Sequence, residues 1–277
     1  MTDTHTPEYQ ARQWWKTDII DMRPGEIRYR GYPIEELIGN VGFADMVWLM
    51  TRGELPTRAQ AALLETALMS AVDHGPQAPS IAIARMAMTC GSSLNNAMAS
   101  AVNVLDDVHG GAGEQAVELY QSILEYQIGG HPLEIAVQEG IATWQRERTR
   151  IIPGFGHRFH PVDPRGPRLL QLVEEAAERG EVDGNFVAIA REVERQLIAM
   201  KGKPIPLNID GATAVIYAEL GFPAPLARGL FCLSRSVGIL AHAWEQQCQG
   251  GRNKGPIPKG WLWPYGGPAA RPVPERG

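Results

Sequence analysis

The stretch from Pro56 to Pro76 reads PTRAQAALLETALMSAVDHGP and combines the two features on which the fold depends. Its first part, residues 56–72, spaces apolar side chains three or four positions apart, at Ala61, Leu64, Leu68 and Val72. This spacing predicts an α-helix with one buried face, and Pro56-Thr57 is a suitable helix start. The stretch then ends in a polar turn, Asp73-His74-Gly75-Pro76, that carries two titratable side chains.

Helical periodicity continues along most of the chain. It predicts helical stretches over Ala82–Val108, Gly113–Tyr126, Leu133–Arg148, Pro167–Arg179, Asn185–Met200, Thr213–Leu220 and Leu226–Gln249. Alternating patterns typical of strands are scarce, and the best of them, Glu26–Tyr32, is short. The sequence therefore predicts a nearly all-α fold.

Composition narrows the class of protein. The 277 residues correspond to between one and two domains, and a hydrophobic content of 44% is enough for a sizeable core. The net charge of −5 gives no general attraction to nucleic acid or to an anionic membrane. The first residues lack an apolar signal core, and no segment reaches about 18 apolar residues without a charge or turn former. Three widely spaced cysteines indicate no disulfide framework, so we expect a soluble, cytoplasmic protein.

Three further turns resemble the first in combining glycine or proline with titratable side chains. They are His109-Gly110-Gly111, the segment 153–157 (PGFGH) and the segment 203–211 (KPIPLNIDG). Loops commonly carry chemistry while helices carry packing. We therefore expect the four turns to converge on one site.

Several kinds of chemistry are disfavoured by the motifs. No H-x-x-x-H or C-x-x-C pair is present, so no metal site is predicted. The phosphate-binding glycine motifs and the serine nucleophile elbow are also missing. Each histidine taken alone is more often an ordinary loop side chain than a catalytic one. Taken together, the turns favour acid–base catalysis by imidazoles and one carboxylate.

The carboxylate is Asp210, which follows the apolar Ile209 and is expected to be partly buried. Burial would raise its pKa and make it a better base for a carbon acid. Arg158 and Arg165 are placed to clamp a carboxylated substrate through paired N–H donors.

These motifs resemble, in order, those of the citrate synthase superfamily, and in particular its citryl-CoA lyase branch, which includes the C-terminal module of ATP-citrate lyase. The resemblance covers roughly residues 27–248. It comprises IRYRGYPIEEL (27–37), GELP (53–56), DHGP (73–76), VHGGA (108–112), GFGHR (154–158), DPR (163–165), NIDG (208–211), SRSVG (234–238), AH (241–242) and EQ (245–246). One such motif would be a weak signal, whereas the ordered set is specific.

The resemblance implies a role for each site residue. His109 matches the histidine that stabilises the acetyl-CoA enolate, Asp210 the carboxylate that removes the methyl proton, and His157 the histidine at the ketone of oxaloacetate. His74 matches a histidine at the keto-acid end, and Arg165 a carboxylate-binding arginine. Arg158 and Lys203 are expected, by looser analogy, to meet CoA phosphates, and Arg252 is the candidate for the family's C-terminal citrate-binding arginine.

The chain also departs from the family pattern. Full-size citrate synthases carry additional N-terminal helices that this shorter chain lacks. The Asp210-Gly211 pair is similar to the lyase module, whereas His109 is a synthase feature that this module often lacks. The expected activity is therefore citryl-CoA lyase, which cleaves citryl-CoA to acetyl-CoA and oxaloacetate. The alternatives are citrate synthase and a catalytically silent acyl-CoA or dicarboxylate-binding protein. The motifs also leave open another 2-oxo acid in place of oxaloacetate, or a longer acyl-CoA in place of acetyl-CoA, as the substrate.

The resemblance also implies an architecture. A large helical domain of residues 1–110 together with 219–277, and a small domain of residues 111–218, would form a cleft that holds the active site. We expect a homodimer or a dimer of dimers, with the C-terminal tail crossing the subunit boundary. Coenzyme A thioesters are expected as substrates, with no permanently bound cofactor.

Overall fold

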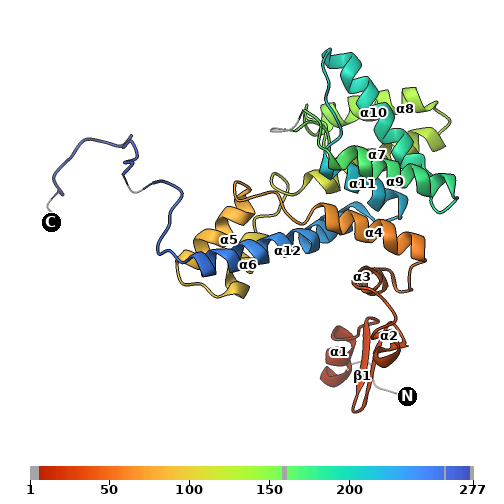
Figure 1. The fold of residues 1–277 in the computed structure, drawn as a ribbon, viewed down its shortest axis with the longest axis horizontal. Helices are drawn as coiled ribbons and strands as arrows, with labels where there is room; N and C mark the ends of the chain where they lie inside the picture. Colours follow the sequence, from red (N-terminus) through yellow and green to blue (C-terminus); the bar gives the residue numbers. More distant parts are fainter. Residues whose placement is uncertain (1–5, 158–160, 259, 275–277) are drawn as a thin grey trace.

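Helices form nearly all of the regular structure (Figure 1). The structure is a computed structural model, and it describes residues 6–157, 161–258 and 260–274. After α1 (Pro7–Trp14), the chain forms β1 (Ile20–Arg23), β2 (Glu26–Tyr29), β3 (Tyr32–Pro33), α2 (Ile34–Leu37) and α3 (Phe43–Arg52). It continues with α4 (Arg58–Ser70), α5 (Pro79–Thr89), α6 (Leu94–Val102), α7 (Ala112–Ile128), α8 (Leu133–Glu147), α9 (Arg165–Glu178), α10 (Asn185–Lys201), α11 (Ile209–Glu219) and α12 (Ala224–Gln249). The all-α prediction is confirmed.

Helix α4 begins where the sequence predicts a helix start. The Thr57 side chain accepts a hydrogen bond from the Gln60 backbone N–H, and the Gln60 side chain accepts one from the Thr57 N–H. This reciprocal cap satisfies two N–H groups that the first turn of a helix leaves unpaired. Leu63, Leu64 and Ala67 are buried, whereas Ala61, Leu68 and Val72 of the predicted face are only partly buried, so the buried face is rotated from the predicted one. The helix ends at Ser70, just before the polar turn.

The predicted helical stretch 82–108 is divided into α5 and α6, so its continuity was wrongly predicted. Gly91 has φ +86°, a conformation that stops the first helix, and Ser93 occupies the N-cap of the second. The predicted strand 26–32 is likewise divided into β2 and β3 by a turn at Arg30 and Gly31, both with positive φ. A strand that the sequence analysis missed, β1, pairs antiparallel with β2 and places Met22 opposite Ile27.

Two helices form the centre of the molecule. α11 is buried along almost its whole length and packs against α7, α9, α10 and α4. α12 packs against α5, α6, α7 and α4. By length and composition α12 could cross a membrane; 44% of its most apolar 18-residue window, which has a mean hydropathy of 1.2, is buried in the protein.

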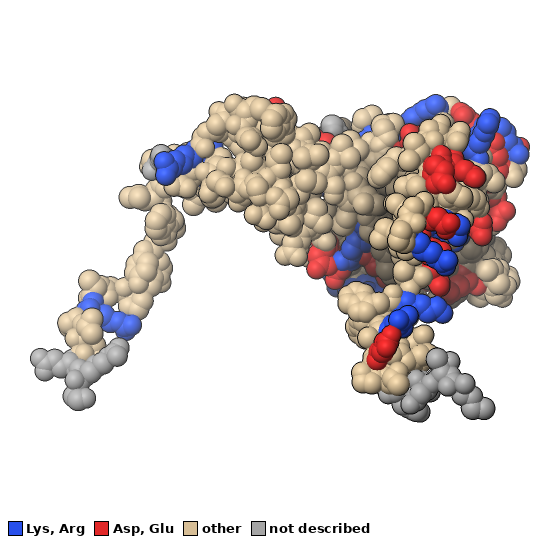
Figure 2. Space-filling model, turned by 90° about the horizontal axis from the view of Figure 1, so that it is seen from below, with Lys and Arg blue, Asp and Glu red and all other residues tan. Residues whose placement is uncertain are grey.

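The helices gather into two groups that meet along α12 and α4 (Figure 1). Helices α7 to α11 pack mainly on one another, and α5 and α6 pack on α12. The strands with α1 and α2 project from the body, and the segment after α12 leaves it at the other side (Figure 1). Figure 2 shows most charged side chains at the end of the molecule opposite this C-terminal segment. The proposed domain boundaries stay a prediction.

Candidate active site

The turn after α4 brings His74 to the candidate site. Asp73 Oδ2 accepts a hydrogen bond from the Gly75 N–H at 3.1 Å, and Gly75 adopts φ +80°. The His74 and His157 rings lie edge to face with their centroids 5.7 Å apart. Loss of water around its ring lowers the pKa of His74, and the positive charges of Arg235 and Arg165 lower it further. Two of the four predicted turns therefore meet directly.

Two cavities share the His74-Gly75 corner. The smaller, about 340 Å³, is lined by Asp73, His74, Gly75, His157, Asp163, Pro164 and Arg165. The larger, about 740 Å³, is lined by His74, Gly75, Pro76, Gln77, Ala78, Pro79, Val108 and His109. A small charged cavity thus adjoins a larger one with more apolar walls. The His74 imidazole lies at their junction, His157 lines the small cavity and His109 the large one.

Asp163 joins Arg165 to the start of α11. Its carboxylate is fully buried and accepts hydrogen bonds from Arg165 Nε and Nη2, both at 2.9 Å, and from the Ile209 N–H at 3.1 Å. Burial acts to raise the pKa of Asp163, but the Arg165 guanidinium and the backbone donors outweigh it and hold this pKa below its ordinary value. Arg165 therefore enters the small cavity already oriented by one carboxylate.

Asp210 lies in the first turn of α11, a correction to its predicted place in a turn between helices. The helix begins early because the Asn208 side chain accepts hydrogen bonds from the Asp210 and Gly211 N–H groups. Burial raises the pKa of Asp210, opposed by Arg235 and Arg165, which confirms the expected direction. Because a raised pKa makes the carboxylate more basic, Asp210 is suited to exchange a proton with carbon.

The loop that carries His157 is held against the start of α11. Asn208 Nδ2 donates to the Gly156 carbonyl at 2.8 Å, and the Asn208 N–H donates to the Gly154 carbonyl at 3.0 Å. Gly154 has φ +82°, and a Cβ at this position would lie 2.6 Å from Gly211 Cα. Glycine is therefore required for the close approach of these two backbones.

The ring of His109 is oriented by Ser80, a buried residue of α5. The Ser80 N–H donates to His109 Nε2 at 3.2 Å, and Ser80 Oγ lies 3.0 Å from the same nitrogen. A nitrogen that accepts an N–H carries no proton, so the neutral ring carries its proton on Nδ1. Burial lowers the pKa of His109, and Arg235 lowers it further. His109 is therefore a neutral hydrogen-bond donor through Nδ1.

Arg235, for which the sequence predicted no role, lies among these groups in the structure. This buried residue of α12 donates from Nε to the Ala71 carbonyl at 3.2 Å, and its guanidinium carbon lies 4.8 Å from the Phe231 ring centroid. Its positive charge acts to lower the pKa of His74, of His109 and of Asp210. The sequence did contain a sign of this role, because Arg235 stands within an apolar helical run. A buried charge is costly unless it has a function or a partner.

Three predicted binding residues are not found among the cavity linings. Arg158 lies outside the described residues. Lys203 is exposed in the segment between α10 and α11. Arg252 is exposed beyond Gln249, the last residue of α12, which itself lies roughly 20 Å along the helix axis from Arg235 by the rise of 1.5 Å per residue. Their roles stay predictions.

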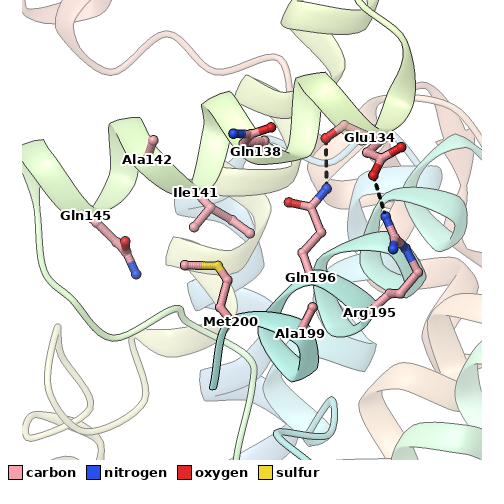
Figure 3. A pocket seen from close by; sticks show the side chains of 9 residues that line it. All are labelled: Glu134, Gln138, Ile141, Ala142, Gln145, Arg195, Gln196, Ala199 and Met200. Carbon is pink, nitrogen blue, oxygen red and sulfur yellow. Dashed lines mark hydrogen bonds and ion pairs between the residues drawn. The ribbon is translucent and has the colours of Figure 1, made fainter. Parts of the chain in front are cut away.

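A further groove lies between α8 and α10 (Figure 3). Its charged side chains are already paired, since Arg195 Nη2 lies 3.0 Å from Glu134 Oε1, and amides and apolar side chains form the remaining lining. Among the described residues, no three His, Cys, Asp or Glu side chains are grouped so that they could hold a metal ion. The histidine cluster is therefore the candidate active site.

Comparison with known proteins shows the family of this chain. The sequence matches the citrate synthase C-terminal domain over residues 12–63 and 58–257. The structure of citryl-CoA lyase from Hydrogenobacter thermophilus is 34% identical, with a TM-score of 0.81 over 94% of this chain and 97% of that one. Citrate synthase of Thermoplasma acidophilum, solved with carboxymethyl coenzyme A and oxaloacetate, is 26% identical, with a TM-score of 0.67 over 84% of this chain and 58% of that one.

Among curated sequences, citrate synthase of Acidithiobacillus ferridurans is 31% identical over 205 residues, or 72% of this chain. The chain spans about half the length of the curated citrate synthases that it matches. The family match covers most of the chain, and the lyase structure is similar over nearly its full length. On this evidence the chain belongs to the citrate synthase family.

Proposed function

We propose that this protein is a citryl-CoA lyase, which cleaves citryl-CoA to acetyl-CoA and oxaloacetate. The observation that carries the proposal is the pair of cavities that meet at His74, one charged and one larger and less polar. The charged cavity suits the dicarboxylate portion of the substrate, and the larger one suits the thioester arm. The 34% identity to the Hydrogenobacter lyase supports cleavage as the direction.

The chemistry follows from the protonation states. In cleavage, His157 accepts the proton of the substrate hydroxyl while the adjacent carbon–carbon bond breaks. The hydroxyl carbon becomes the ketone of oxaloacetate, and the electron pair of the broken bond forms the acetyl-CoA enolate. His109 donates its Nδ1 proton as a hydrogen bond to the enolate oxygen, and Asp210 delivers a proton to the enolate carbon. Groups preplaced for this developing charge lower the barrier.

The carboxylates of the substrate face positive charge. Arg165 lines the small cavity, and the Arg235 charge acts on both His74 and Asp210. We assign His74 to the keto-acid end. The assignment of Arg252 to a substrate carboxylate requires the C-terminal tail to cross into the site of the partner subunit, because Arg252 lies beyond the end of α12. We assign Arg158 and Lys203 to the CoA phosphates. The proposal includes coenzyme A thioester as substrate, no permanent cofactor and a cytoplasmic location.

Citrate synthase is the second candidate function, because the Thermoplasma and Acidithiobacillus relatives are citrate synthases. Both reactions pass through the same acetyl-CoA enolate. A synthase also hydrolyses the citryl thioester, whereas a lyase leaves it intact. A catalytically silent binding protein would bind the thioester without turnover.

The test offers the purified protein citryl-CoA and, in a separate reaction, acetyl-CoA with oxaloacetate. We expect citryl-CoA to yield acetyl-CoA and oxaloacetate without release of free CoA. Free CoA with citrate from the second mixture would instead establish a synthase. Binding of acetyl-CoA by calorimetry with no product in either mixture would establish a silent binding protein.

Domain closure and dimer formation are part of the proposal. The small domain of residues 111–218 would close on the large domain of residues 1–110 and 219–277, with hinges at 109–113 and 203–211. Crystals with and without oxaloacetate would test this movement, and identical domain orientations would contradict it. In the dimer, the C-terminal tail would cross the subunit boundary.

A further inference from the structure

A second cluster of titratable side chains lies beside the candidate site, centred on His242 of α12. His242 Nε2 lies 3.2 Å from Asp73 Oδ1, and Arg85 Nη1 lies 3.3 Å from His242 Nδ1. Arg85, on α5, also contacts Glu245 Oε2 at 2.5 Å and Gln249 Oε1 at 2.7 Å. The cluster therefore connects two core helices to the residue immediately before His74.

The proton arrangement of His242 follows from its partners. A guanidinium N–H can only donate, so Nδ1 accepts from Arg85 and the neutral ring carries its proton on Nε2. That proton faces Asp73 Oδ1 across an ion-pair contact of 3.2 Å, and this buried oxygen makes no well-aligned hydrogen bond among the described residues. The second oxygen, Oδ2, accepts the Gly75 N–H. Asp73 therefore contacts His242 through Oδ1 and holds the backbone of the His74 turn through Oδ2.

One face of α12 holds the whole segment that leads to His74. Ser234 Oγ donates to the Leu68 carbonyl at 2.5 Å, and Arg235 Nε donates to the Ala71 carbonyl. The Gly238 N–H donates to the Val72 carbonyl at 3.1 Å, and a Cβ on Gly238 would lie 3.0 Å from Asp73 Oδ1. Residues 234, 238 and 242 are four positions apart and lie on one helical face. His242 is the last contact of this series and acts on the side chain next to His74.

We propose that His242 is a positioning residue that acts through Asp73 to fix His74 at the corner shared by the two cavities. It does not touch the substrate; it maintains the turn that presents His74 to the keto-acid portion. The groups that face it are Asp73 from the turn, Arg85 from α5 and Glu245 from α12. The inference rests on the proposed function, because it assigns His242 an effect on the carboxylated substrate.

The test compares two substitutions at one position. His242→Leu removes the hydrogen bond to Arg85 and the polar contact with Asp73, whereas His242→Gln keeps a terminal amide N–H that can reach Asp73. Replacing a polar group that faces a buried carboxylate oxygen by an apolar one is costly. In the condensation direction we therefore expect His242→Leu to raise the KM for oxaloacetate about tenfold while the KM for acetyl-CoA changes less than twofold. We expect His242→Gln to recover most of the wild-type value. His131→Leu, at an exposed histidine after α7, is the control and should change neither constant.

A double-mutant cycle tests the route through Asp73. If His242 acts through that carboxylate, adding His242→Leu to Asp73→Asn should change the KM for oxaloacetate by much less than the product of the single effects. Multiplicative effects would overturn the inference. Equal increases in both KM values would also overturn it, because they would indicate a general structural role.

A spectroscopic measurement separates failure of this inference from failure of the proposed function. In protein labelled with ¹⁵N-histidine, we expect His242→Leu to shift the ring signals of His74 while those of His109 stay in place. This readout needs no turnover. If no substrate is converted but the His74 signals shift, the positioning role holds and the proposed function fails. Unchanged His74 signals in a folded His242→Leu variant would overturn the positioning role.

Discussion

At the scale of single residues, burial sets the chemistry of Asp210. Its carboxylate is desolvated near the start of α11, and Arg235 and Arg165 compensate only part of that cost, so its pKa stays above the ordinary value of 3.8. Asn208 holds the first turn of α11 in place. The residue thus combines a fixed position with a proton that is readily gained and lost.

Asp210→Asn should lower turnover by about 10²–10⁴-fold, the usual contribution of a positioned proton-transfer group, while CoA thioester binding changes little. The measurement is exchange of the acetyl-CoA methyl protons with solvent in the presence of an oxaloacetate analogue. Asp18→Asn, at an exposed position before β1, is the matched control. Exchange by Asp210→Asn at the wild-type rate would remove Asp210 from the mechanism.

The raised pKa of Asp210 also predicts a pH dependence of stability. The folded state binds this proton more tightly than the unfolded state, so the cost of ionising Asp210 is absent below its ordinary pKa and reaches its full value above the raised pKa. Asp210→Asn should therefore have a higher Tm than the wild type at pH 7, with the difference shrinking as the pH falls towards the ordinary pKa. Thermal unfolding monitored by circular dichroism checks this, and a difference that grows on acidification would contradict it.

At the scale of elements, the close contact between the loop 154–157 and α11 joins His157 to Asp210. Backbone hydrogen bonds from Asn208 and Gly156 tie the two segments together. Such an approach is possible because Gly154 and Gly211 lack side chains. The geometry of the site therefore depends on residues that have no chemistry of their own.

Gly154→Ala should separate these elements and lower both stability and turnover. The added Cβ would meet Gly211 Cα at 2.6 Å, and overpacking of this kind typically costs about 1–3 kcal/mol. Gly130→Ala is a matched control because Gly130 also has positive φ, at +95°, but open space around its Cβ position. Both variants strain the backbone, so the excess loss of activity and Tm in Gly154→Ala reports the contact. Equal losses would show that backbone strain alone is responsible.

At the scale of the whole molecule, α12 presents an exposed apolar stripe as well as its buried face. Leu233, Val237, Leu240 and Trp244 are 42–58% exposed and recur every three or four residues. A stripe with this period lies on one face of the helix. In Figure 2 the surface between the C-terminal segment and the charged end shows few charges. The stripe supports the proposed homodimer, because contiguous exposed apolar surface commonly marks an interface.

Val237→Glu should weaken the proposed dimer by burying an unpaired charge in its interface. Sedimentation velocity at micromolar concentration should show a dimer for the wild type and a shift towards monomer for the variant. Ile128→Glu is the control, since Ile128 is exposed at the end of α7, outside the stripe. A monomeric wild type would contradict the proposed dimer. A Val237→Glu variant that still forms the dimer would show that the stripe is not the dimer interface.

Local patterns predict most of the helices and the chemistry-bearing turns, because helical periodicity and turn formation depend on residues a few positions apart. In the stretch 56–76 the helix start at Thr57 and the terminal turn follow from its own residues. Of the predicted face Ala61, Leu64, Leu68 and Val72, however, only Leu64 is fully buried, because neighbouring helices decide which side of α4 is covered. The division of the stretch 82–108 at Gly91 was not predicted, since a glycine within a helical pattern is often tolerated.

Which side chains meet depends on the packing of the helices. The contact between His74 and His157, the influence of Arg235 on three site residues and the link from His242 to Asp73 all join residues far apart in the chain. Their distances depend on how α4, α11 and α12 pack, and packing is set by the summed contacts of the whole core. Burial, which sets the pKa of Asp210, is likewise a property of that packing and of no single segment.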